Sequence, residues 1–101
     1  MACEYVLLPR AQADFERIVR YLAIELASPQ AASRFVGEFE ERISLVCEHP
    51  EMCPLSRMPE VAARGYRAKR VMGCMVLYAH RDERIVVAHI FHMLQDYARY
   101  V

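Results

Sequence analysis

The sequence lacks net charge, a long apolar run and the common catalytic fingerprints. Its 13 Lys and Arg residues balance 13 Asp and Glu residues, so the whole chain is not expected to be a strong general DNA binder. The longest uncharged run of the second half, residues 71–79, is far shorter than the roughly 20 apolar residues that a membrane-spanning helix needs. We therefore expect no membrane span.

We also expect no secretory leader at the N-terminus. Glu4 stands where such a leader carries lysines, and Pro9-Arg10 interrupts the short apolar run behind it. The four cysteines include no CxxC pair, and the chain is 55% hydrophobic with six methionines, which favours buried, reduced thiols. These features predict a cytoplasmic protein.

Metal and cofactor motifs are equally sparse. Cys47, His49 and Cys53 are close in sequence, but they lack a fourth ligand at a usual zinc spacing. The chain contains no P-loop, GxSxG, HExxH or dinucleotide fingerprint. We expect neither a metal nor a cofactor.

What the sequence does contain is a pattern of two helices between strands. The length of 101 residues fits a single domain, residues 1–101. A short strand over 3–8 is followed by a helix that begins at Pro9, and Ser28-Pro29 begins a second helix that ends near Glu48. The apolar residues Phe15, Ile18, Val19, Leu22 and Leu26 predict the buried face of the first helix, with Asp14 among its polar residues.

The second half of the chain is rich in β-forming residues. Residues 51–63 predict a loop, residues 66–71, 74–80 and 84–92 predict an antiparallel meander, and residues 93–101 predict a last helical turn or edge segment. The order β-α-α-β-β-β predicts an α+β fold, with a helical hairpin packed on one face of the sheet and the other face partly open.

Positive charge gathers on the first strand of the meander. Arg64, Arg67, Lys69 and Arg70 lie within seven residues that contain no acid, and Arg67 and Lys69 share one face because side chains alternate along a strand. Such a strand can bind phosphate or an acidic partner. Basic residues on an edge strand also protect a sheet from aggregation, so this structural interpretation stays open.

Several short motifs along the chain match a known family in order and spacing. They are Pro9-x-Ala11, Asp14-Phe15-x-x-Ile18-x-x-Tyr21, Pro29-x-Ala31-Ala32, His49-Pro50, Gly65-Tyr66-Arg67, Val76-Leu77-Tyr78, residues 86–90 and His92-x-x-x-Asp96-Tyr97. With these motifs the chain resembles the RelE/ParE superfamily of bacterial type II toxins. The resemblance implies a toxin neutralised by an antitoxin that wraps over its helices and sheet. In such pairs the antitoxin touches DNA, so sequence-specific DNA binding by this chain is not expected.

The resemblance implies two alternative activities. RelE-like members cleave messenger RNA on the ribosome, and Arg67, Lys69 and His92 would then be the catalytic residues. ParE-like members inhibit DNA gyrase, and Met75, which stands where RelE-like enzymes place an arginine, slightly favours this activity. A non-toxic binding module of the same fold is a third hypothesis. In each case we expect a contact surface for the target or the antitoxin that contains Arg64, Tyr66, Arg70, Tyr78, Asp96 and Tyr97.

Overall fold

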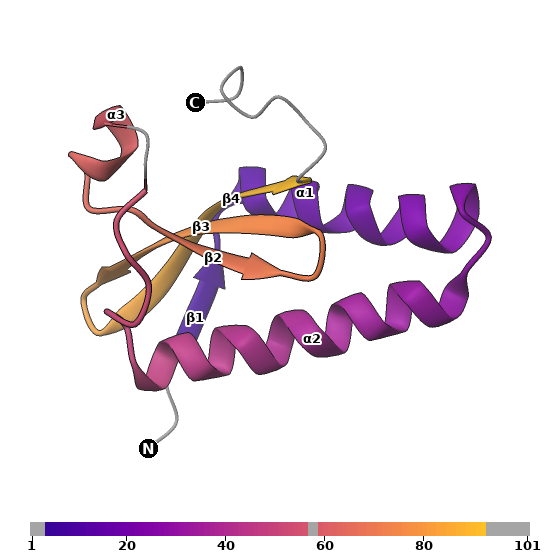
Figure 1. Cartoon of the computed structure of the whole chain (residues 1–101), viewed down its shortest axis with the longest axis horizontal. Coiled ribbons are helices and arrows are strands. Elements are labelled where there is room, and N and C mark those ends of the chain that lie inside the picture. Colours follow the sequence, from indigo (N-terminus) through magenta and orange to yellow (C-terminus); the bar gives the residue numbers. More distant parts are fainter. Residues whose placement is uncertain (1–3, 57–58, 93–101) are drawn as a thin grey trace.

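A helical hairpin covers a four-stranded sheet in the computed structural model, which describes residues 4–56 and 59–92 (Figure 1). The predicted element order and α+β class are confirmed, and a short helix, α3, stands within the predicted loop. The elements are β1 (Glu4–Leu7), α1 (Pro9–Arg20), a π-helical turn (Tyr21–Glu25), α2 (Pro29–Glu48), α3 (Pro59–Ala62), β2 (Arg67–Val71), β3 (Cys74–Arg81) and β4 (Arg84–His92).

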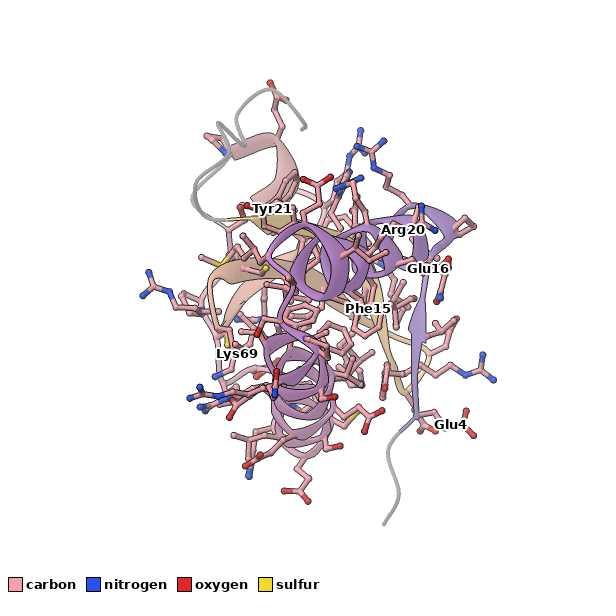
Figure 2. All side chains as sticks on the ribbon, turned by 90° about the vertical axis from the view of Figure 1, so that its right-hand side faces the viewer. Glu4, Phe15, Glu16, Arg20, Tyr21 and Lys69 are labelled. Atoms are coloured by element: carbon pink, nitrogen blue, oxygen red, sulfur yellow. The ribbon has the colours of Figure 1, made fainter. Side chains whose placement is uncertain are left out.

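The sheet has the strand order β1-β4-β3-β2. Strands β2, β3 and β4 form the predicted antiparallel meander. Strand β1 pairs with β4 in parallel, so the sheet is mixed and the expectation of an antiparallel sheet holds only for the meander. Tight turns fix the relative direction of β2, β3 and β4, whereas no such turn joins β1 to β4. Glu4 on β1 and Lys69 on β2 accordingly lie at opposite sides of the molecule in Figure 2.

Local sequence signals fix the starts of both helices. Pro9 and Pro29 occupy the first turns of α1 and α2, where proline's missing N–H costs no hydrogen bond. Ser28 caps α2, because its side-chain oxygen accepts a hydrogen bond of 3.2 Å from the Ala31 N–H. No helix of the described residues is long and apolar enough to cross a membrane.

The end of the first helix differs from its prediction. The α-helix stops at Arg20 and continues as a π-helical turn, which rotates the following side chains relative to the α-helical pattern. Leu26, predicted to be in the core, is 54% exposed, and Ile24 is 69% exposed. The end of the hairpin therefore presents apolar side chains to solvent.

The core lies between the hairpin and one face of the sheet. Phe15 points from α1 toward α2 (Figure 2), and its ring centroid is 4.9 Å from that of Phe39. This edge-to-face contact joins the two helices through their aromatic residues. The buried residues of the cluster are Ala11, Ile18, Phe35, Phe39, Ile43, Val46, Cys47, Cys53, Val71, Cys74, Val76, Tyr78, Ile85, Val87 and Ile90.

A second, smaller cluster occupies the opposite face of the sheet. Leu77 and Phe91 are buried there, and Tyr66 and Ala68 pack against them. The two clusters use alternate residues of β3, as the period of a strand requires. The face that was expected to be partly open thus carries its own apolar contacts.

Candidate functional site

The basic strand presents its two candidate catalytic residues toward the helices. Arg67 pairs with Tyr78 and Lys69 pairs with Val76, and both of these β3 residues belong to the main core. Arg67 and Lys69 therefore share a face of the sheet, as the alternation predicts. Both side chains are half-buried, so neither stands on an open strand surface.

Arg67 and Tyr78 together hold the loop that precedes β2. The Arg67 guanidinium donates a 2.6 Å hydrogen bond to the Cys53 carbonyl oxygen, and the Tyr78 hydroxyl donates one of 3.2 Å to the Pro50 carbonyl oxygen. Tyr78 is completely buried, and this burial raises its pKa above the usual value for a tyrosine. Tyr78 therefore contributes to the core and not to a contact surface. We call these two bonds the loop anchor.

The same loop covers the first half of the β2 edge. Leu55 forms an isolated antiparallel bridge with Arg67, and the Ser56 N–H donates to the Tyr66 carbonyl oxygen at 2.9 Å. These contacts pair backbone groups that an edge strand otherwise leaves open. Arg67 thus helps to close a sheet edge, which supports the structural interpretation of its charge.

The other predicted surface residues are distributed over both sides of β2. The side chain of Lys69 makes no ion pair or hydrogen bond with the described residues. Arg70 is exposed and pairs with Met75 on β3. The Tyr66 ring lies 5.8 Å from the guanidinium carbon of Arg81, within the range of a cation–π contact. The same Arg81 guanidinium donates a 2.6 Å hydrogen bond to the Arg64 carbonyl oxygen.

The predicted catalytic set is spread along the sheet. His92 pairs with Cys74, while Arg67 pairs with Tyr78 and Lys69 with Val76. From Arg67, the His92 backbone therefore lies two strands across, about 10 Å, and four residues along, about 13 Å. The His92 side chain, Asp96 and Tyr97 lie outside the described residues. The backbone register separates Arg67 from His92 and places Lys69 between them.

The cysteines of the described residues do not form a metal centre. Cys47, Cys53 and Cys74 form no disulfide and are buried, and burial raises the pKa of the Cys74 thiol to about 11. No group of three or more His, Cys, Asp or Glu side chains in residues 4–56 and 59–92 is arranged to hold a metal ion. Cys47 instead donates its thiol hydrogen toward the Glu4 carbonyl oxygen at 3.8 Å.

The structure shows a polar site that the sequence pattern does not predict. Asp14, expected on the polar side of α1, is only 1% exposed, because α1 packs its N-terminal half against the edge of β4. Asp14 Oδ2 accepts hydrogen bonds from the Ile90 N–H at 3.1 Å and from His89 Nδ1 at 3.0 Å. Its Oδ1 lies 3.0 Å from an Arg17 nitrogen and 3.5 Å from Arg10 Nε. We call this group the helix anchor.

The end of β1 explains why a carboxylate is needed there. Strand β1 pairs with β4 only as far as Val87, after which the outer edge of β4 has no strand beside it. Asp14 takes the place of a neighbouring strand by accepting the Ile90 N–H, which would otherwise be a buried, unpaired donor. The signal in the sequence is an acid flanked by the apolar positions Ala11 and Ile18 of an amphipathic helix.

A bulge in β4 brings His89 to this carboxylate. Tyr78 pairs with Val87 and Leu77 pairs with His89, so Ala88 is an extra residue and the alternation changes face beyond it. His89 then stacks on Phe91, with ring centroids 4.6 Å apart. Burial lowers the pKa of His89, while the Asp14 carboxylate partly opposes this effect. Because a carboxylate can only accept, Nδ1 carries the hydrogen of this bond, and in the neutral ring Nε2 is then the unprotonated nitrogen.

Comparison with known proteins connects this fold to one family. The family model described as the ParE toxin of the type II toxin-antitoxin system parDE matches residues 5–97. The chain belongs to the ParE toxin family. A solved structure titled "Chromosomal ParDE TA system from P. aeruginosa" is similar with a TM-score of 0.69 and 16% identity, over 90% of this chain and 96% of that one. A search of curated proteins found no match.

Membership of the ParE family confirms the predicted resemblance and its main consequence. The chain is a toxin of the ParE-like kind, from a type II system in which an antitoxin is the partner. The match includes the helix anchor, strands β2, β3 and β4, and β1 apart from Glu4. The site residues inferred from the RelE-like pattern stay predictions.

Proposed function

We propose that this ParE-family toxin inhibits DNA gyrase, and that its cognate antitoxin keeps it inactive in the cytoplasm. The observation that carries the proposal is the state of Arg67, whose guanidinium is bonded to the Cys53 carbonyl at 2.6 Å. A nuclease would need this arginine to contact the scissile phosphate. The separation of Arg67 from His92 along the backbone register also supports a toxin that acts by binding.

A supercoiling assay with purified toxin tests the gyrase proposal. We expect supercoiling to stop as toxin is added, and to recover when antitoxin is present in excess. Normal supercoiling at saturating toxin would contradict the proposal. Translation-dependent cuts inside open reading frames after induction would favour the RelE-like activity instead. Unchanged growth after induction would favour a non-toxic binding module.

We also propose that the exposed basic and apolar residues around β2 form part of the contact surface for the antitoxin or the target. Arg70 is exposed next to half-buried Tyr66 and Ala68, and these lie on the face of the sheet opposite the main core. Replacing Arg70 by Glu should weaken the toxin–antitoxin complex, measured by calorimetry, more than Arg34→Glu on α2. Equal effects of the two charge reversals would argue against this surface.

A further inference from the structure

The helix anchor pairs two arginines with one carboxylate, so their positive charge is only partly neutralised. Arg10 and Arg17 are two helical turns apart on α1, and both reach Asp14 Oδ1 between them. Their side chains stay 55% and 56% exposed, while that of Asp14 is 1% exposed. Two guanidinium charges thus face one carboxylate charge, so the outer side of the cluster carries excess positive charge.

The negative charge of Asp14 is directed inward. Its Oδ2 is occupied by the Ile90 N–H and by His89 Nδ1, and its Oδ1 lies behind the two guanidinium groups. Each guanidinium has five N–H donors, and Asp14 is the only partner of either arginine among the described residues. The donors that Asp14 does not accept are therefore available to another ligand on these half-exposed side chains.

His89 adds a group that can respond to a bound anion. Its Nε2 has no partner among the described residues, and no buried side-chain nitrogen or oxygen there lacks a partner, so Nε2 is in contact with solvent. The charged groups that face His89 are Asp14, Arg10 and Arg17 on α1, while β3 presents the apolar Leu77 opposite it. Apart from Asp14, the charges that act on His89 are thus those of the two arginines.

From this geometry we propose that Arg10 and Arg17, which converge on Oδ1 of buried Asp14 and are flanked by His89, form a binding site for a phosphate group. The planar guanidinium matches the geometry of phosphate oxygens, and anchoring by Asp14 reduces the side-chain entropy that binding would cost. The site is distinct from the β2 surface, and the inference does not depend on the proposed gyrase activity.

Binding at this site is coupled to the protonation of His89. Burial lowers the pKa of His89 most, and the two arginines lower it further; a phosphate bound to the arginines would oppose their field. Protonated Nε2 would in addition donate a hydrogen bond to the anion. Phosphate binding should therefore raise the pKa of His89, an effect that a merely structural role of the arginines would not produce.

The test is an NMR titration of the His89 ring with inorganic phosphate at constant ionic strength, with chloride as the balancing anion. We expect saturable shifts with about millimolar affinity, typical of an open site that solvent screens, and an upward shift of the His89 pKa. Arg17→Gln and Arg10→Gln should each weaken binding at least about threefold. Arg42→Gln, which removes an exposed arginine paired with Glu38 on α2, is the matched control and should leave binding unchanged.

A second titration separates the sources of the phosphate. A single-stranded oligonucleotide without terminal phosphates presents only diesters, whereas inorganic phosphate represents a free or monoester group. Arg17-dependent binding of either probe supports the site and identifies its class of ligand. The proposal is overturned if neither probe shifts His89 beyond the chloride control, or if Arg42→Gln weakens binding as much as Arg17→Gln.

Discussion

Two anchors fix segments to this sheet, and they use opposite chemistry. The helix anchor joins α1 to β4 through a buried carboxylate with cationic partners. The loop anchor joins residues 50–56 to β2 and β3 through Tyr78 and Arg67, whose partners are neutral backbone carbonyls. A buried charge must be fully paired to be tolerated, whereas the acceptors of the loop anchor are neutral and its one charged donor, Arg67, is only half-buried. The helix anchor should therefore be the more sensitive of the two to mutation and pH.

The largest effect is expected from Asp14→Ala. This change leaves the Ile90 N–H buried without an acceptor and opens a space at the α1–β4 junction, so stability should fall by about 3 kcal/mol. Urea unfolding of the free toxin measures the loss. Asp14→Asn retains an acceptor oxygen and should lose clearly less. If the alanine variant unfolds at the same urea concentration as the wild type, Asp14 does not anchor the helix.

A smaller loss is expected from Tyr78→Phe in the loop anchor. The substitution keeps the ring in the core and removes the hydroxyl's hydrogen bond to the Pro50 carbonyl together with its contact to Cys53, which should cost about 1–2 kcal/mol. Hydrogen exchange should show that the substitution reduces protection more at the amides of residues 50–56 than at those of α1. A loss as large as that of Asp14→Ala would remove the proposed difference between the anchors.

The pH dependence of stability provides a third test of the comparison. The folded protein lowers the pKa of His89, so the unfolded chain binds the proton more readily. Above the unfolded-state pKa of about 6.5, His89 is neutral in both states and its contribution to stability is fully present. As pH falls below this value, the unfolded chain takes up the proton first, so the free energy of unfolding decreases until pH passes the lower folded-state pKa. Unfolding followed from pH 8 to 5 should show this loss in the wild type and in the exposed-residue control His80→Gln, but less in His89→Gln. An unchanged slope in His89→Gln would contradict the assignment.

These differences explain what the sequence could and could not predict. Helix starts at Pro9 and Pro29 and the meander of β2–β4 follow from local signals, since caps and tight turns act over a few residues. The parallel position of β1, the burial of Asp14 and the face of His89 depend on a pairing across the chain and on a bulge at Ala88. Periodicity therefore assigned Asp14 to the polar face.

The same limit applies to the candidate surface on β2: local signals in the sequence locate its charge but not its long-range contacts. The sequence identified the charge cluster around Arg67 and Lys69, and their common face is confirmed by the register. It could not show that the Arg67 guanidinium donates a hydrogen bond to the Cys53 carbonyl oxygen, because that bond joins residues 14 positions apart. A strand of basic residues thus predicts where charge lies, but not which charges stay available for a ligand.

The smallest effect is expected from Arg17→Gln, and it tests where the strength of the helix anchor lies. Arg17 is 56% exposed, so water screens its ion pair, and its loss should cost at most about 0.5–1 kcal/mol despite the buried partner. Urea unfolding beside Arg42→Gln measures the difference from an ordinary surface pair. A small loss would mean that Asp14 stabilises the junction mainly through Ile90 and His89, leaving the arginines available for an anion. A loss near that of Asp14→Ala would mean that Arg17 is required for folding and would make its role in ligand binding secondary.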